Sequence, residues 1–326
     1  MDHVGILKKA WRITFRHRAL WVLGFLWALL GGSGGGGGSR VINFVNAFPQ
    51  SEFGSGANAT LFHIKIVLSQ YLGWLFLGAC FFFLLGVVMV ALRYVLQAGV
   101  YRVLYRLEEG GIAPTVSAGF REGWHRRTWR LFLQNLLVGL VVGVVMAFFA
   151  AMIALAALLL LSDNSGAHWA AVAGMVVWGM LTLVVILLLT VVLSVLSRFW
   201  WRAAIIDDMG AVDAMGYAWR LVKTHFSDVA VVWLLMFGVG LLFGMVMLLF
   251  MLFLLALAAM TAGLPGYLLY EATGSIFAGL LWGVPAGLAI LILPTLFVTG
   301  LYLIFNVAIW NDLYLRLTHS ELETPS

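Results

Sequence analysis

The sequence predicts an all-α protein: a polytopic transmembrane helix bundle of about six spans, in three repeats of one amphipathic interfacial helix plus two spans. Three observations predict this class. Hydrophobic residues make up 63% of the 326 residues, charged residues 10%, and the mean hydropathy is +1.03, whereas soluble domains are roughly half apolar and a quarter charged. Uncharged runs such as residues 169–197 and 229–270 exceed the ~20 residues that cross a bilayer. Finally, a tryptophan motif recurs ahead of apolar segments.

The apolar runs place the predicted spans at residues 19–38, 66–92, 131–161, 169–197, 229–262 and 276–308. The first span is the least well defined. Its apolar run, Ala19 to Leu30, rises only about 18 Å as a helix, so it must recruit neighbouring residues or enter the membrane without crossing it. We expect it to cross, because the corresponding segments of the other repeats do.

The repeat is defined by Ala-Trp-Arg, four further residues and a histidine, at residues 10–17 and again at residues 218–225. A looser copy, Gly-Trp-His with Arg130 in place of the histidine, lies at residues 123–130. Each copy runs directly into an apolar segment. The motif divides a single integral membrane domain, residues 1–326, into repeats at 1–97, 98–197 and 198–317, with a glycine-rich loop at 31–60 and a short polar tail at 318–326.

The distribution of basic residues predicts the orientation. An even number of spans places the tryptophan helices and both termini on one side of the membrane. Of the 19 Lys and Arg residues, all except Arg40 and Lys65 fall on that side, and loops rich in Lys and Arg remain in the cytoplasm. We therefore expect a multi-pass protein of the cytoplasmic (inner) membrane with both termini in the cytoplasm.

The tryptophan helices are the candidate contact surfaces. In the third, an apolar set recurs at helical spacing: Ala211, Met215, Ala218, Trp219 and Val222. Amphipathic basic helices of this kind lie in the headgroup layer of a membrane. They either anchor and orient the chain or recognise membrane lipids or a protein partner at the cytoplasmic face. The candidate contact residues are Trp11, Arg12, Trp124, Arg126, Arg127, Trp219, Arg220 and Lys223.

Catalytic, metal-binding and cofactor-binding patterns are not found in the sequence. The histidines form no H-x-x-x-H or H-E-x-x-H arrangement, and Cys80 is the single cysteine. The acidic pairs Glu108-Glu109 and Asp207-Asp208 could hold a divalent cation or a lipid amine. Their place just before a glycine and a helix favours a structural role, in which they cap the helix and balance nearby arginines. We expect a non-enzymatic protein without cofactors or nucleic-acid partners.

Glycines at four-residue spacing predict close helix packing. Gly279, Gly283 and Gly287 follow this spacing in the last span, and the pairs at 139 and 143 and at 240 and 244 follow it in earlier ones. Small residues at this spacing let helix backbones approach closely. Packing within the chain is the default interpretation. A homo-oligomer through these Gly-x-x-x-Gly faces is the alternative, but nothing in the sequence indicates it.

The tryptophan motif and the closing stretch at residues 307–317, VAIWNDLYLRL, carry a resemblance to known proteins. The chain resembles bacterial and archaeal multi-pass membrane proteins of the glycerophosphoryl diester phosphodiesterase membrane domain type and related uncharacterised families. In some of these the membrane region is fused to a soluble barrel whose active site begins His-Arg-Gly. Here Ala19 follows His17-Arg18 and no barrel is present, so the resemblance implies no hydrolase activity and transfers no functional residue.

These expectations combine into one leading function and one alternative. The leading hypothesis is a non-enzymatic membrane protein that organises lipid or partner proteins through its basic cytoplasmic helices. The alternative is a permease or lipid-handling transporter with a cavity between repeats. A polar cavity at mid-membrane depth would favour transport, and a dry, glycine-packed centre would favour the organising role.

Overall fold

The computed structural model describes residues 3–31, 57–108, 110, 115–125, 128–158, 160 and 165–323, and these residues form helices and connections without a strand. The all-α class is therefore confirmed. The helices in chain order are α1 (His3–Arg16), α2 (Arg18–Leu29), α4 (Ala57–Glu108), α5 (Val116–Gly123), α6 (Thr128–Leu158), α7 (Ser165–Ile205), α8 (Ala211–Thr224), α9 (Phe226–Ala258), the short π-helix η2 (Ala259–Gly263), α10 (Leu264–Thr273) and α11 (Ile276–Glu323).

The described part of the chain contains five helical segments long and apolar enough to cross a membrane: Phe76–Glu108, Thr128–Leu158, Gly166–Ile205, Phe226–Thr273 and Ile276–Ser320. Five of the six predicted spans are thus found among these residues. The first predicted span, 19–38, forms only α2, a helix of 12 residues. Because α1 ends at Arg16 and the helix breaks at His17, α2 does not recruit the turns before it. Residues 32–38 lie outside the described ranges.

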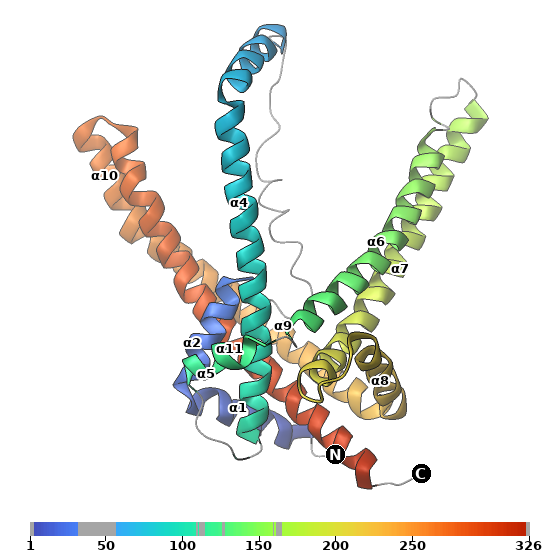
Figure 1. Ribbon diagram of the computed structural model, residues 1–326. Coiled ribbons are helices and arrows are strands. Elements are labelled where there is room, and N and C mark those ends of the chain that lie inside the picture. The colour runs from blue at the N-terminus through green and yellow to red at the C-terminus, as the bar shows by residue number, and fades with distance from the viewer. Residues whose placement is uncertain are drawn as a thin grey trace.

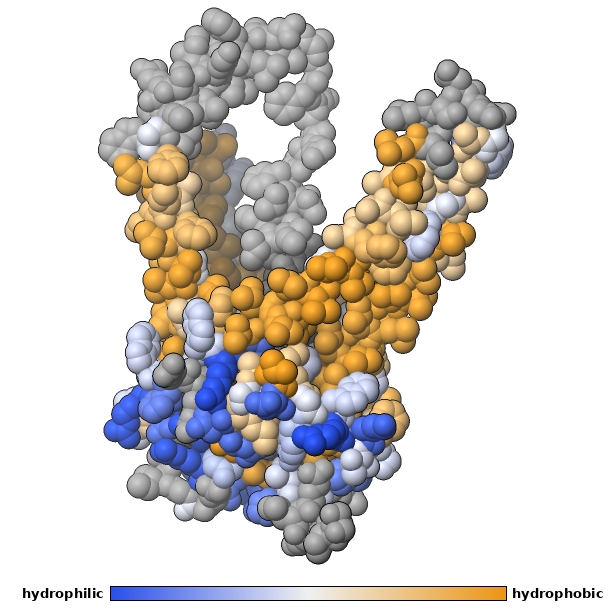
Figure 2. All heavy atoms as spheres, turned by 45° about the vertical axis from the view of Figure 1, so that its right-hand side comes forward, coloured by the Kyte–Doolittle hydropathy of each residue, from blue (hydrophilic) through white to orange (hydrophobic). Residues whose placement is uncertain are grey.

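The long helices diverge as three arms from a common base (Figure 1). One arm is α4, the second is the α6–α7 hairpin, and the third pairs α9, η2 and α10 with α11. The arms comprise residues 76–93, 131–158, 165–193 and 237–302. The base comprises α1, α2, α5, α8 and the adjoining ends of the long helices. Figure 2 shows the arms covered by apolar side chains and the polar ones gathered on the base. Only 0% to 17% of each arm's apolar stretch is buried.

The hydrophobic core lies in the base. Buried residues from α1, α2, α4, α6, α7, α8, α9 and α11 form one cluster, which includes Leu104, Phe199 and Ile304. The α4 helix has 52 residues and α11 has 48, or about 70–80 Å at the usual rise, well beyond a bilayer core of ~30 Å. Beyond the predicted span ends at 92, 197 and 308, α4, α7 and α11 run on to Glu108, Ile205 and Glu323, and these extensions pack together in the base.

Glycines set the closest helix approaches. Gly300 of α11 meets Gly24 of α2 so closely that a Cβ built on Gly300 would lie 2.5 Å from the Gly24 carbonyl carbon. A Cβ on Gly279 would lie 2.6 Å from the Gly266 carbonyl oxygen, so the predicted stripe on the last span packs within the chain, as the default interpretation expected. By contrast, Gly139 and Gly143 have no neighbour within 4 Å of a built Cβ.

Candidate functional site

The tryptophan motif has the same placement in its two strict copies. Ala10 and Ala218 are 2% and 0% exposed, whereas the adjacent Trp11 and Trp219 are 59% and 56% exposed. The histidine that closes each motif breaks the helix, at residues 17 and 225, with φ near −111° and −112°. The small residue thus packs against the base and the tryptophan faces outward. The larger organisation into three repeats stays a prediction.

The looser copy behaves similarly where the structure describes it. Gly123 is buried against α4, where a Cβ would lie 2.0 Å from the Val95 carbonyl oxygen. Trp124, at the end of α5, is 71% exposed. With His125, it lines an apolar cavity of about 820 Å³ at the root of the α4 and α6 arms. Arg126 and Arg127, two of the predicted contact residues, lie outside the described residues.

The first motif builds a groove that combines cations with aromatic rings. Its inward face on α1 consists of Ile6, Ala10 and Thr14, all buried. Its outward face presents Lys8, Trp11 and Arg12, which line a groove of about 510 Å³ together with Leu7 and Phe305. The Trp11 ring lies 4.3 Å from the Phe15 ring and 6.1 Å from the Phe305 ring, measured between centroids. Two exposed cations are therefore fixed beside an aromatic cluster.

In the third motif, Ala218 is the only fully buried member of the predicted apolar set. The buried residues of α8 are Ala214, Ala218 and Leu221. Small side chains allow α8 to pack close against α7 and α6, and the bulky indole of Trp219 is left outside with Arg220 and Lys223, both exposed.

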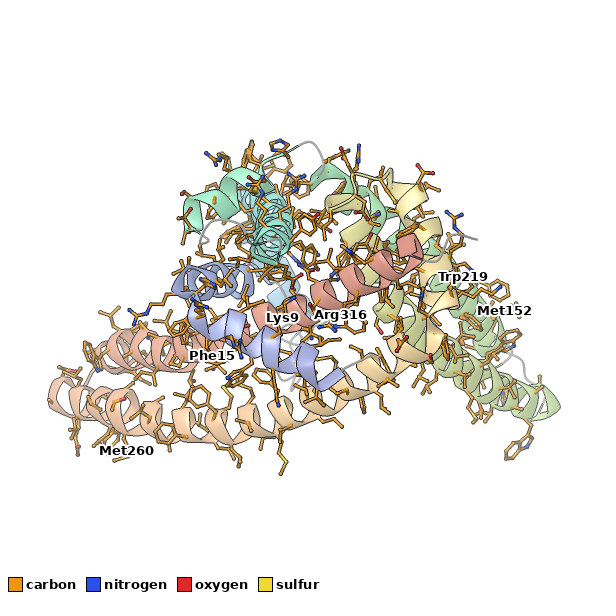
Figure 3. All side chains as sticks on the ribbon, turned by 90° about the horizontal axis from the view of Figure 1, so that it is seen from below. Lys9, Phe15, Met152, Trp219, Met260 and Arg316 are labelled. Carbon is orange, nitrogen blue, oxygen red and sulfur yellow. The ribbon has the colours of Figure 1, made fainter. Side chains whose placement is uncertain are left out.

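The structure distributes these faces around the base and does not gather them into one pocket. Helix α1 packs on α11 and α2, α5 packs on α4 and α2, and α8 packs on α7 and α6. Viewed from below, Phe15 of α1 and Trp219 of α8 lie on different sides of the base (Figure 3). We refer to the exposed groups Lys8, Trp11, Arg12, Trp124, Trp219, Arg220 and Lys223 as the Trp–Arg faces.

Several other basic residues form ion pairs that join the helices of the base. Lys9 Nζ lies 2.5 Å from Asp312 Oδ1, and Arg316 Nε donates to Asp312 Oδ2 at 2.9 Å; Lys9 and Arg316 are labelled beneath the base in Figure 3. Arg106 Nη1 lies 2.7 Å from a carboxylate oxygen of Glu122. The short helices are thereby tied to the long ones, and these cations serve the fold.

The acidic pair at 207–208 also serves the fold. Asp208, at φ +58°, accepts a hydrogen bond from Arg130 Nη1 at 2.7 Å, which agrees with the expectation that these acids balance arginines. The Tyr314 hydroxyl donates to Asp207, and burial raises the pKa of the Asp207 carboxyl above its usual range while this hydrogen bond opposes the shift. Glu109 of the other pair lies outside the described residues. Within those residues, no group of three His, Cys, Asp or Glu side chains is placed to hold a metal ion.

The buried polar network at the centre of the base was missed by the sequence analysis. Arg202 is fully buried; its Nε donates to Asn311 Oδ1 at 2.6 Å, its Nη2 to the Val307 carbonyl at 3.1 Å, and its guanidinium lies 5.0 Å from the Tyr101 ring centroid. The sequence did contain a signal for this network. Arg198 and Arg202 lie one helical turn apart at the end of an apolar run, and a charge buried there requires partners.

Comparison with known proteins extends over almost the whole chain. A model described as a family of unknown function (DUF7544) matches residues 9–317. The chain belongs to this family. The DUF7544 match includes both the base and the arms. No curated protein and no solved structure matches the chain. Membership of an uncharacterised family is thus shown, and the comparisons give no support to the narrower resemblance to the glycerophosphoryl diester phosphodiesterase membrane domain type.

Proposed function

We propose that this protein is a non-enzymatic membrane protein that organises anionic lipid around its base through the Trp–Arg faces. One observation carries the proposal: at both strict copies of the motif the small residue is buried and the Trp-Arg pair points outward. A helix that served only to pack against the base would not need an exposed indole beside an exposed cation at the same position twice.

The chemistry of these faces suits a headgroup layer. Indole rings prefer the boundary between acyl chains and water. Each Lys or Arg near an anionic surface contributes about 1 kcal/mol to binding. Arg12, Arg220 and Lys223 are exposed on the surface of the base, in contrast to Lys9 and Arg106, which form ion pairs within the base.

The same argument favours the cytoplasmic side for the base. The start of α1 and the end of α11 lie at the base (Figure 1), together with most of the basic residues. Basic segments remain on the cytoplasmic side during insertion, and the cytoplasmic leaflet is the anionic one. We propose the cytoplasmic membrane as the location.

The test replaces Arg12, Arg220 and Lys223 with Gln in one variant and compares it with a matched control, in which Arg16, Arg18 and Arg121 are replaced with Gln. All six residues are exposed in the base, and both variants lose the same charge. Purified proteins would be reconstituted in nanodiscs of phosphatidylcholine and phosphatidylglycerol, and the phosphatidylglycerol enriched around the protein would be measured by mass spectrometry. The first variant should lose about a hundredfold in apparent affinity, because three cations contribute about 1 kcal/mol each, and the control should lose much less.

Two outcomes would contradict the proposal. If both variants lost phosphatidylglycerol equally, net charge alone would account for the enrichment. If the first variant retained it at the wild-type level, the Trp–Arg faces would have no part in lipid binding.

A lipid-handling transporter is the second candidate, and the apolar cavity of about 820 Å³ at the root of α4 and α6 is the observation that favours it. An acyl chain could enter this cavity from the side. The assay is transbilayer movement of a fluorescent phospholipid in proteoliposomes. Movement above that of protein-free vesicles, abolished by Ala91→Trp in the cavity wall, would support transport over a static organising role.

A further inference from the structure

A second cavity, of about 260 Å³, lies where the α6–α7 arm and the α9–α11 arm meet the base. Its polar lining comes from Ser194 and Arg198 of α7 and from Tyr302 and Asn306 of α11. Apolar residues of α9 and the Trp310 ring complete the wall. Since a water molecule occupies about 30 Å³ in the liquid, this volume accommodates a phosphate and the atoms next to it.

Arg198 is held in a fixed orientation inside this cavity. Its Nη1 donates to Asn306 Oδ1 at 2.6 Å, and its guanidinium carbon lies 5.6 Å from the Trp310 ring centroid. The side chain is partly exposed, unlike the fully buried Arg202 one turn later. An amide and an aromatic ring thus orient the guanidinium toward the cavity without adding negative charge to its wall.

The lining defines the charge of the ligand. Among the described residues that line the cavity there is one cation and neither Asp nor Glu. The Tyr302 hydroxyl adds a donor, and it lies in the space that Gly240 leaves open, 3.3 Å from the position of a Cβ on that glycine. A planar guanidinium fork matches phosphate oxygens, so the cavity favours a phosphate group over a cation or a neutral molecule.

The position of the cavity defines the rest of the ligand. Arg198 lies near the base end of the apolar segment Gly166–Ile205, where the cavity adjoins the apolar arms. The walls continue into the exposed apolar surfaces of the two arms, including Phe237 and Leu241. An amphiphile with a phosphate head and apolar tails fits both parts, with its head at Arg198 and its tails along the arms.

We infer that the cavity around Arg198 binds the phosphate of a single anionic phospholipid. This inference deepens the proposed function, since the ligand is again a lipid, but it rests on different residues. It describes one discrete, slowly exchanging lipid, in contrast to the diffuse enrichment expected at the Trp–Arg faces.

The experiment measures the lipid that survives delipidation. Protein from phosphatidylcholine and phosphatidylglycerol nanodiscs would be transferred to detergent and examined by native mass spectrometry. The wild type should retain one phosphatidylglycerol. Arg198→Gln should weaken retention about ten- to one-hundredfold, the range for a charged hydrogen bond.

A second variant tests the same cavity in case Arg198→Gln fails to fold. Gly240→Leu fills the cavity without removing the charge, and Gly244→Leu is its matched control one turn along α9, where a built Cβ has nothing within 4 Å. Retention should fall in Gly240→Leu and persist in Gly244→Leu. The Arg12, Arg220 and Lys223 variant should also keep the bound lipid, so that failure here and failure of the proposed function are distinguishable.

Three results would overturn the inference. One is a wild type that retains no phosphatidylglycerol, or that retains phosphatidylcholine equally well. Another is retention unchanged in both Arg198→Gln and Gly240→Leu. The third is displacement by inorganic phosphate at comparable concentration, which would identify free phosphate and not a lipid as the ligand of the cavity.

Discussion

The base and the arms differ in which side chains they bury, and therefore in how much each contributes to tertiary stability. The base buries apolar residues together with Arg202, Asn311 and Asp312, and each of these polar groups has partners in neighbouring helices. The arms leave most of their Leu, Val and Phe side chains exposed. Lipid chains are as apolar as those side chains, so packing arm against arm brings little hydrophobic gain, and each arm helix satisfies its own backbone hydrogen bonds. Tertiary stability should therefore reside in the base.

The largest expected effect comes from Arg202→Met in the centre of the base. The change removes the donor to Asn311 and to the Val307 carbonyl, which leaves buried polar groups without a partner. We expect the free energy of unfolding to fall by about 2–4 kcal/mol, because each buried acceptor left without a partner costs about 1–3 kcal/mol; titration with SDS in mixed micelles measures it. The control is Leu248→Ala in an arm, 61% exposed, with a change of about 0.5 kcal/mol or less. Equal effects would contradict the division into base and arms.

An intermediate effect is expected from Gly300→Ala. A methyl group here meets the α2 backbone at 2.5 Å, so α2 and α11 must separate, at a cost of about 1–3 kcal/mol. Gly139→Ala is the matched control, because a Cβ there has open space and alanine favours the helix. Thermal melts of both variants in the same detergent measure the difference. A melting temperature of Gly300→Ala at or above that of Gly139→Ala would show that this contact does not hold α2 against α11.

The smallest effect on stability is expected from the combined Arg12, Arg220 and Lys223 to Gln variant. These side chains are exposed at the rim of the base, and surface changes of this kind are usually within about 0.5 kcal/mol each. The same melts should show a nearly unchanged transition in detergent, although lipid enrichment is lost. A large destabilisation in detergent would mean that these residues serve the fold and not the membrane contact.

The fold class and the approximate spans could be predicted because hydropathy is local. Where each helix ends could not, since α4, α7 and α11 continue through charged residues that become buried only when the helices meet. Arg102 at the end of α4, for example, is only 17% exposed and pairs with Glu122 of α5. The divergence of the arms could not be predicted either. The sequence of an apolar helix in lipid says little about which other helix it contacts.

Polar residues in the apolar runs differ in whether they form hydrogen bonds within a helix or between helices. Gln134 donates to the Ala211 carbonyl at 3.2 Å, Asn135 to the Tyr94 hydroxyl at 3.2 Å, and Asn306 accepts from Arg198, all between helices. Thr182 bonds instead to the Trp178 carbonyl of its own helix. Long amides reach a neighbouring helix, whereas a threonine hydroxyl is near the carbonyl four residues earlier.

The most direct test of the account is the side of the membrane on which the base and the arm tips lie. In a Cys80→Ser background, which removes the single cysteine, Gly216→Cys would report on α8 in the base and Ala272→Cys on the far end of α10. Right-side-out membrane vesicles would be treated with an impermeant maleimide before and after permeabilisation. We predict labelling of Ala272→Cys at once and of Gly216→Cys only after permeabilisation. Labelling of both from the same side, or the reverse pattern, would contradict arms that cross the membrane from a cytoplasmic base.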